Sequence, residues 1–169
     1  MLSQQPYKVL CVCLGNICRS PTAEAVLRHF CQQQQLNVHV DSAGTAAYHI
    51  GEAPDSRSQQ YAKQRGYDLS NLRARQLSPQ DFQDFDLILA MDEQNLKNIQ
   101  RIEQQAQVQF STQSLRAQVA MMTEHASEFQ GQAIADPYYG GAAGFEQVLD
   151  QCEIASQAWV NVFKSSQKQ

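Results

Sequence analysis

Residues Tyr7 to Pro21 read Tyr-Lys-Val-Leu-Cys-Val-Cys-Leu-Gly-Asn-Ile-Cys-Arg-Ser-Pro and contain the pattern that decides the fold. The segment from Tyr7 to Val12 is apolar and rich in Val, Leu and Cys, which predicts a buried strand. A loop containing Gly15 follows, and Ser20-Pro21 is typical of an N-cap followed by proline at the first helical position. The stretch therefore predicts a strand, a loop and a helix.

The rest of the chain repeats this alternation of strand and helix. Further strands are predicted at residues 38–40, 86–91 and 118–122. Asp55 opens one helix as its N-terminal residue, Asp92 can cap the next, and a third begins near Phe145. Such alternation predicts an α/β fold: a single domain with a doubly wound four-stranded parallel sheet and helices on both faces. In that fold the ligand site lies beyond the carboxyl ends of the strands.

Composition restricts the classes of function. The chain has 169 residues, with 13 Lys and Arg against 17 Asp and Glu, a formal net charge of −4. That balance does not fit a sequence-independent nucleic-acid binder, which must neutralise phosphates. The apolar run from Val9 to Leu14 is too short for a membrane span, and Lys8 alone makes a poor signal-peptide basic region. We therefore expect a cytoplasmic protein with no nucleic-acid partner and no membrane span.

The five cysteines, at positions 11, 13, 18, 31 and 152, form no Cys-x-x-Cys pair, so free thiols are expected. Cys11, Cys31 and Cys152 fall on apolar faces and are interpreted as core residues. A metal site built from Cys11, Cys13 and Cys18 is disfavoured by their spacing. The four histidines, at positions 29, 39, 49 and 125, are expected on the surface.

The first loop is the predicted site. It reads Cys13-Leu14-Gly15-Asn16-Ile17-Cys18-Arg19-Ser20, and it ends at a helix N-terminus, where inward N–H groups favour an anion such as phosphate. Arg19 can clamp two phosphate oxygens. The same field favours a thiolate at Cys13, which would be a nucleophile without any metal. The loop lacks the Gly-Lys-Ser/Thr ending of a nucleotide-binding loop, so no cofactor of that kind is expected.

The string from Val12 to Pro21 resembles the signature of the low-molecular-weight protein-tyrosine phosphatases. Three later segments resemble the same family in the same order: Asp41-Ser42-Ala43-Gly44-Thr45, Met91-Asp92-Glu93 and Asp136-Pro137-Tyr138-Tyr139-Gly140. The resemblance implies one phosphatase domain over residues 1–169 with a core of about residues 7–165. It also implies a metal-independent hydrolase that cleaves phosphotyrosine through a phosphocysteine intermediate and releases inorganic phosphate.

By this resemblance Cys13 is the nucleophile, Arg19 binds phosphate and stabilises the transition state, and Asp136 is the general acid. Protonation of the leaving oxygen is useful because a phenol has a pKa near 10; the alternative is that Asp136-Pro137 only starts a turn. Residues implied to bind phosphate or the substrate ring are Leu14, Gly15, Asn16, Ile17, Cys18, Tyr48, Tyr138 and Tyr139. The tyrosines could instead pack under loops.

Asn16, Ser20 and Ser42 resemble the hydrogen-bond network that holds the family's loop in shape, although capping or turn formation explains each separately. Leu72 stands where several members have a histidine of that network, which predicts weaker loop support. Cys18 has two interpretations: a redox partner that forms a reversible disulfide with Cys13, or a small residue filling the loop floor. Residues 102–115 look longer than the corresponding segment of the family, and the sequence does not predict their structure.

Competing functions leave different signatures. Arsenate reductases share the fold but pass a disulfide to further cysteines, and the chain has none between Cys31 and Cys152. Protein-arginine phosphatases typically carry Thr where this loop has Ile17 and Phe where the chain has Tyr138. A non-catalytic phosphate-binding module would lack the nucleophile, the arginine or the acid. The expected partners are therefore phosphotyrosine proteins, with a bacterial tyrosine kinase as the family-level example.

Overall fold

A parallel sheet forms the centre of the fold. The computed structural model describes residues 4–167. Within that range the strands are β1 (Tyr7–Cys13), β2 (Val38–Gly44), β3 (Leu87–Ala90) and β4 (Gln118–Met121), in the order β2-β1-β3-β4. Val9 of β1 is paired with Val40 on one side and Leu87 on the other. The predicted four-stranded parallel sheet is confirmed.

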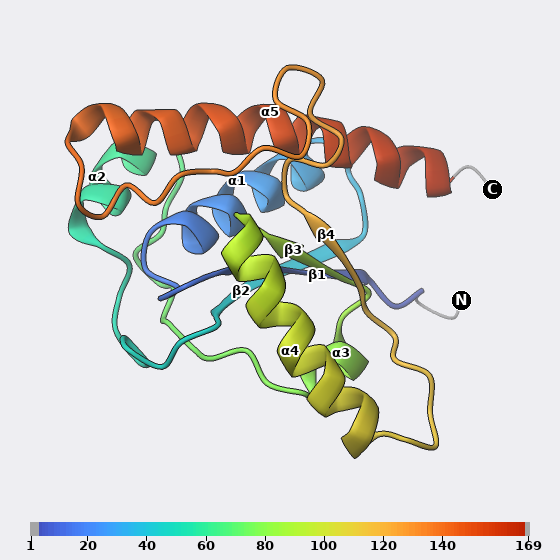
Figure 1. Ribbon diagram of the computed structural model, residues 1–169. Coiled ribbons are helices and arrows are strands. Elements are labelled where there is room, and N and C mark those ends of the chain that lie inside the picture. The colour runs from blue at the N-terminus through green and yellow to red at the C-terminus, as the bar shows by residue number, and fades with distance from the viewer. Residues whose placement is uncertain (1–3, 168–169) are drawn as a thin grey trace.

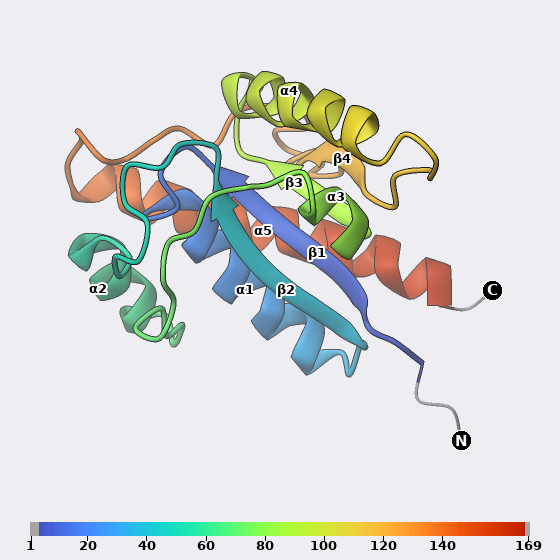
Figure 2. The same ribbon diagram turned by 90° about the horizontal axis from the view of Figure 1, so that it is seen from below.

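Helices cover both faces of the sheet. They are α1 (Arg19–Gln33), α2 (Ser56–Gln64), α3 (Asp81–Asp84), α4 (Glu93–Gln109) and α5 (Ala142–Gln167). Figure 1 shows α5 lying along α1, and in Figure 2 these two helices are on the opposite side of the sheet from α3 and α4. This is the doubly wound arrangement expected from the alternation of elements.

The alternation of side chains along β1 explains the two layers. Val9 and Cys11 are fully buried in the core under α1 and α5, whereas Leu10 and Val12 are fully buried in the core under α3 and α4. Successive residues of a strand point to opposite faces, so a strand covered on both faces must be apolar throughout. Cys31 and Cys152 also lie in the first core, as the sequence predicted.

Two of the predicted helix caps are confirmed. The Asp55 carboxylate accepts a hydrogen bond from the Arg57 N–H at the start of α2, and the Asp92 carboxylate accepts one from the Asn95 N–H at the start of α4. Each satisfies a backbone donor that the first helical turn leaves unpaired. Gly66, just past the end of α2, has a φ of +89°, the left-handed conformation that favours glycine there.

The predicted cap of α1 is wrong by two residues. Cys18 is the N-cap and makes no side-chain cap hydrogen bond, and Arg19 is the first helical residue. The Ser20 hydroxyl is instead engaged with the loop that precedes the helix, as described below. Pro21 still lies in the first turn, where its missing N–H costs no helical hydrogen bond.

The strand order determines where the loop after β1 lies. Residues 102–115 continue α4 to Gln109 and then form a turn. β1 occupies an inner position in the sheet, and the chain leaves it toward α1 at the point where the strand order reverses. The loop from Cys13 to Arg19 therefore lies at the topological switch point. Between residues 4 and 167 no helix is long and apolar enough to cross a membrane.

Candidate active site

The loop after β1 wraps around the Cys13 sulfur. The Asn16 N–H donates a hydrogen bond to Cys13 Sγ over 3.3 Å, and the Ser20 Oγ lies 3.0 Å from the same sulfur. Cys13 is only 3% exposed. The loop therefore places one backbone donor, the Asn16 N–H, and one hydroxyl against this buried sulfur.

Asn16 holds the shape of the loop. Its φ of +59° lies in the left-handed region, which asparagine tolerates better than most residues. Its side-chain nitrogen donates to Ser20 Oγ over 2.7 Å and to Ser42 Oγ over 2.9 Å. The three residues predicted to support the loop are thus in direct contact. Asn16 is itself 2% exposed and does not line the cavity, unlike the other predicted phosphate-binding residues.

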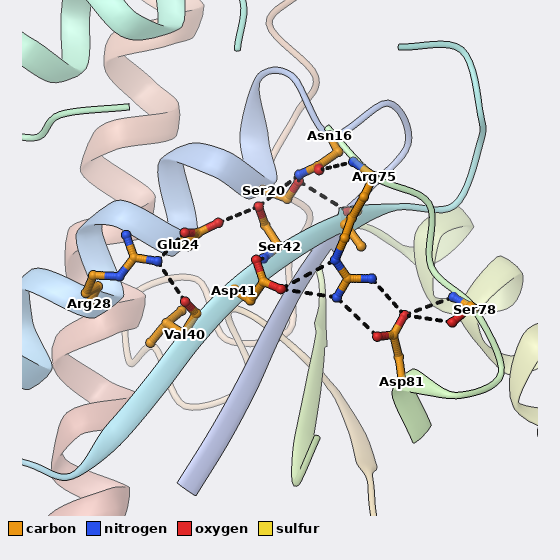
Figure 3. Close-up of polar contacts among 11 residues, drawn as sticks. Asn16, Ser20, Glu24, Arg28, Val40, Asp41, Ser42, Arg75, Ser78 and Asp81 are labelled. Atoms are coloured by element: carbon orange, nitrogen blue, oxygen red, sulfur yellow. Dashed lines mark hydrogen bonds and ion pairs between the residues drawn. The ribbon is translucent and has the colours of Figure 1, made fainter. Parts of the chain in front are cut away.

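A buried carboxyl group extends this network. Glu24 of α1 accepts a hydrogen bond from Ser42 Oγ over 2.7 Å and pairs with Arg28 one helical turn later (Figure 3). Burial raises the pKa of the Glu24 carboxyl, although the hydrogen bond from Ser42 and the charge of Arg28 lower it. Glu24 carries no signal in the sequence, where its position on α1 looks like an ordinary helical one.

Arg19 is fixed by groups distant in the sequence. Its Nη1 donates to Asp92 Oδ2 over 2.5 Å and to the Ile134 carbonyl over 3.0 Å, while its Nη2 lies 3.7 Å from Asp136 Oδ2. The Arg19 side chain is 4% exposed. Asp92 thus does two things, since its other oxygen caps α4. Only the capping role was predicted from the sequence.

Asp136 reaches the site from the segment between β4 and α5. The Ile134 N–H donates to the Met91 carbonyl over 2.8 Å, which ties this segment to the carboxyl end of β3. The Asp136 Oδ1 accepts a hydrogen bond from the Tyr138 N–H over 3.0 Å, the contact expected for the turn interpretation. The other oxygen faces Arg19. The turn and the position facing the loop therefore coexist in one residue.

A cavity of about 300 Å³ opens above the loop. It is small for a ligand pocket but large enough for a phosphate and part of an aromatic ring. Tyr48, Tyr138 and Tyr139 form its rim, and Tyr138 and Tyr139 meet edge to face with ring centroids 4.9 Å apart. Tyr48 is 74% exposed and Tyr139 95% exposed, so these two rings do not pack under loops.

His49 was predicted to lie on the surface but lines the cavity. It is half-buried, lines the cavity beside Gly15, and its Nδ1 lies 2.8 Å from Glu52 Oε2. His29 is also half-buried, against the Tyr67 ring, whereas His39 and His125 are exposed as predicted. A solitary histidine in a loop carries no periodic signal, so only the folded arrangement of the loop reveals its contact.

The Leu72 side chain is apolar and cannot hydrogen-bond to the loop network; it packs against the core that underlies α1 and α5. The polar contact from this segment comes from Arg75, whose backbone N–H donates to Asn16 Oδ1 over 3.0 Å. The backbone N–H three residues after Leu72 thus supplies a polar contact to Asn16, and the effect of Leu72 itself on loop support stays a prediction. Neither Arg75 nor its contact was foreseen from the sequence.

Burial raises the pKa of the other four thiols, Cys11 included. All five cysteines lie within residues 4–167 and are free. Burial raises the pKa of the Cys18 thiol to about 12, and burial likewise raises that of Cys31 and Cys152 to about 12. Thiols in such surroundings stay protonated and react slowly. Among the described residues there is no group of three or more His, Cys, Asp or Glu side chains suited to holding a metal ion.

Comparison with known proteins places this geometry in a family. Residues 8–169 match the family model described as low molecular weight phosphotyrosine protein phosphatase. The chain is 45% identical over 153 residues to the protein of that name from Schizosaccharomyces pombe, covering 89% of this chain and 92% of the relative.

Solved structures agree with this assignment. A crystal structure of a protein tyrosine phosphatase from Entamoeba histolytica matches with a TM-score of 0.83 and 36% identity, covering 95% of this chain and 99% of the other. A drosophila arginine phosphatase matches with a TM-score of 0.84 and 34% identity, covering 93% and 98%. The chain belongs to the low molecular weight phosphotyrosine protein phosphatase family, whose phosphocysteine chemistry fits the cysteine, arginine and aspartate gathered at this cavity.

Proposed function

We propose that this phosphatase hydrolyses phosphotyrosine with Cys13 as nucleophile, Arg19 as the phosphate clamp and Asp136 as the acid. The observation that carries the proposal is the convergence of three groups on one cavity. Cys13, Arg19 and Asp136 all line the cavity. Cys13 Sγ accepts a hydrogen bond from a loop N–H, and Arg19 Nη2 lies 3.7 Å from the Asp136 carboxyl. A nucleophile, an anion clamp and an acid around one phosphate-sized space are the requirements of phosphoryl transfer through a covalent intermediate.

In the first step the Cys13 thiolate attacks phosphorus in line with the tyrosine oxygen. The S–P bond forms as the P–O bond to the ring breaks, and the leaving oxygen takes the proton of Asp136. Charge on the three remaining phosphoryl oxygens is stabilised by loop N–H groups and by Arg19. Asp92 and the Ile134 carbonyl hold Arg19 Nη1, so the guanidinium is oriented before substrate arrives.

In the second step water attacks the phosphocysteine. The Asp136 carboxylate accepts a proton from that water, the S–P bond breaks, and inorganic phosphate leaves with Cys13 restored as thiolate. Ser20 Oγ, 3.0 Å from Cys13 Sγ, supports the leaving sulfur by hydrogen bonding. The two steps together consume one water and return Asp136 to its protonated form.

The substrates belong to the phosphoprotein class, and the rim supports phosphotyrosine among them. Tyr48, Tyr138 and Tyr139 surround the opening and can contact an aromatic ring edge to face or stacked. We propose a bacterial tyrosine kinase as one such substrate. We also propose a cytoplasmic location, which free thiols favour, and a domain core at about residues 7–165. The likeness to an arginine phosphatase makes phosphoarginine the second candidate substrate.

The test is hydrolysis of p-nitrophenyl phosphate, with EDTA present, by the parent protein and by Cys13→Ser, Arg19→Ala and the control Cys31→Ala. Cys31 is another buried thiol, placed in α1 away from the cavity. Cys13→Ser is expected to abolish turnover, Arg19→Ala to cost on the order of 10²–10³ in kcat, and Cys31→Ala to retain turnover. Turnover that survives in Cys13→Ser would refute the covalent mechanism.

Phosphotyrosine and phosphoarginine peptides of matched sequence then separate the two candidate substrates. A higher kcat/KM for phosphotyrosine is expected. A preference for phosphoarginine would keep the mechanism and change the substrate.

A further inference from the structure

Arg75 does not line the cavity. Its side chain and its backbone both make contacts next to the residues that support the loop from Cys13 to Arg19, called the phosphate loop below. It belongs to the irregular segment between α2 and α3. Its side chain makes a two-pronged ion pair with Asp81, with Nη1 and Nη2 at 3.0 and 3.1 Å from the two carboxylate oxygens. The same guanidinium reaches Asp41 of β2, with Nη2 at 3.2 Å (Figure 3).

Each of these carboxylates also accepts a backbone hydrogen bond, which for Asp41 comes from the Ser42 N–H over 2.8 Å. Asp81 is nearly buried, starts α3 and accepts a hydrogen bond from the Ser78 N–H over 2.9 Å. Asp41 directly precedes Ser42, whose hydroxyl accepts a hydrogen bond from the Asn16 side-chain amide. The Arg75 side chain therefore joins α3 to the end of β2, and its rigid fork suits two carboxylates better than a lysine would.

The backbone of Arg75 makes the second connection. Its N–H donates to Asn16 Oδ1 over 3.0 Å, and its carbonyl accepts the Gly44 N–H over 2.8 Å. Asn16 uses its two amide hydrogens on Ser20 and Ser42, so the bond from Arg75 fixes the remaining polar atom of the side chain. Together the three bonds hold both polar atoms of the amide.

The loop depends on that orientation. Asn16 has a φ of +59°, and a residue held in this region persists only where its surroundings over-determine it. The Asn16 N–H is also the donor to Cys13 Sγ. We propose that Arg75 is a positioning residue: by clamping Asp41 and Asp81 it holds its own N–H against Asn16 and so keeps the phosphate loop in its binding shape. The inference rests on the catalytic role proposed for that loop.

The experiment compares Arg75→Ala and Arg75→Lys with Arg116→Ala as matched control. Arg116 makes a similar two-pronged pair with Asp86, at 2.7 and 3.1 Å, next to the amino end of β3 and far from the loop. For each protein three quantities are measured: kcat and KM for p-nitrophenyl phosphate, the inhibition constant of inorganic phosphate, and the phosphate concentration that protects Cys13 from iodoacetate. Melting temperature reports the loss of stability.

For Arg75→Ala we expect kcat/KM to fall and both phosphate constants to rise, by about ten- to a hundredfold, because small displacements of positioned groups have effects of that size. Arg75→Lys should be intermediate, since it keeps the charge but not the fork. Arg116→Ala should stay within about twofold of the parent despite a similar loss of stability.

Phosphate constants in Arg75→Ala and Arg75→Lys equal to those of the parent would overturn the inference. So would losses in Arg116→Ala that match those in Arg75→Ala, since the effect would then follow stability alone. If Arg75→Ala does not fold, Arg75→Lys and Asp41→Asn decide on the same measurements. A parent protein without turnover would instead refute the proposed function, which separates the two failures.

Discussion

Gly44, at the end of β2, is the position where a single added methyl group should damage the site most. A Cβ built there would lie 2.7 Å from the Leu14 carbonyl oxygen and 3.1 Å from the Asn16 nitrogen. The first distance is about 0.7 Å short of ordinary van der Waals contact. Both neighbours are backbone atoms of the phosphate loop, and the Leu14 carbonyl is also held by the Ala46 N–H at 2.9 Å. The loop itself must move.

The magnitude follows from this geometry. Overpacking of this kind costs about 1–3 kcal/mol, which for a domain of this size lowers Tm by about 2–12 °C. Displacing the donor to Cys13 Sγ by a few tenths of an ångström should lower kcat/KM by about ten- to a hundredfold. Gly44→Ala should therefore lose activity and phosphate affinity together with stability.

Two other glycines provide the controls. Gly66→Ala meets no atom within 4 Å but must adopt a φ of +89°, so it should lose about 1–2 kcal/mol of stability with unchanged kcat/KM. Gly15→Ala meets the His49 ring at 2.9 Å, a side chain that can rotate, so its effect should be milder than that of Gly44→Ala. The assays are thermal unfolding, p-nitrophenyl phosphate kinetics and phosphate inhibition. Parent-like phosphate inhibition in Gly44→Ala, or greater damage from Gly15→Ala, would show that the added Cβ does not displace the loop backbone.

Three further predictions concern the acid, a buried carboxyl and a buried thiol. Asp136→Asn should slow phenyl phosphate more than p-nitrophenyl phosphate, because the poorer leaving group needs the proton more; equal slowing would argue against the acid role. Burial raises the pKa of Glu24 from its ordinary 4.5, so the folded protein keeps a proton that the unfolded chain releases. The unfolding free energy of the parent, measured in urea, should therefore be highest relative to Glu24→Gln below about pH 4.5, and this advantage should fall as pH rises through the raised pKa; a constant difference would contradict the assignment. Cys18, with its pKa raised to about 12 by burial, should resist iodoacetamide at pH 8 while Cys13 is labelled, as peptide mass spectrometry would show. Comparable labelling of the two thiols would be inconsistent with that environment.

The order of strands and helices could be predicted because each depends on local chemistry. The apolar run at residues 86–91 is required for a strand covered on both faces, and Asp55 and Asp92 are caps whose partners lie two or three residues away. The short helix α3 escaped prediction because four residues are too few to show a helical period. The start of α1 was misplaced because the Ser20 hydroxyl bonds to the loop and not to the helix end.

In the candidate site, too, some features could be predicted from the sequence and others only from the folded structure. The Cys13 to Arg19 loop is continuous in sequence, so the sequence alone determined its place between β1 and α1 and its capacity to bind an anion at a helix N-terminus. Its partners were decided by the tertiary structure. Asp92 is 73 residues from Arg19 and the Ile134 carbonyl 115 residues away, and Arg75 is 59 residues from Asn16.

Such contacts depend on how loops cross the carboxyl end of the sheet, where no periodicity records the neighbour of a side chain. Cys13, Arg19 and Asp136 could be proposed from motifs, because each motif is a short contiguous string. His49 beside the cavity and Arg75 behind it carry no such string. Only packing of the folded chain, which brings distant backbone and side-chain groups within hydrogen-bonding distance, determined where these two residues act.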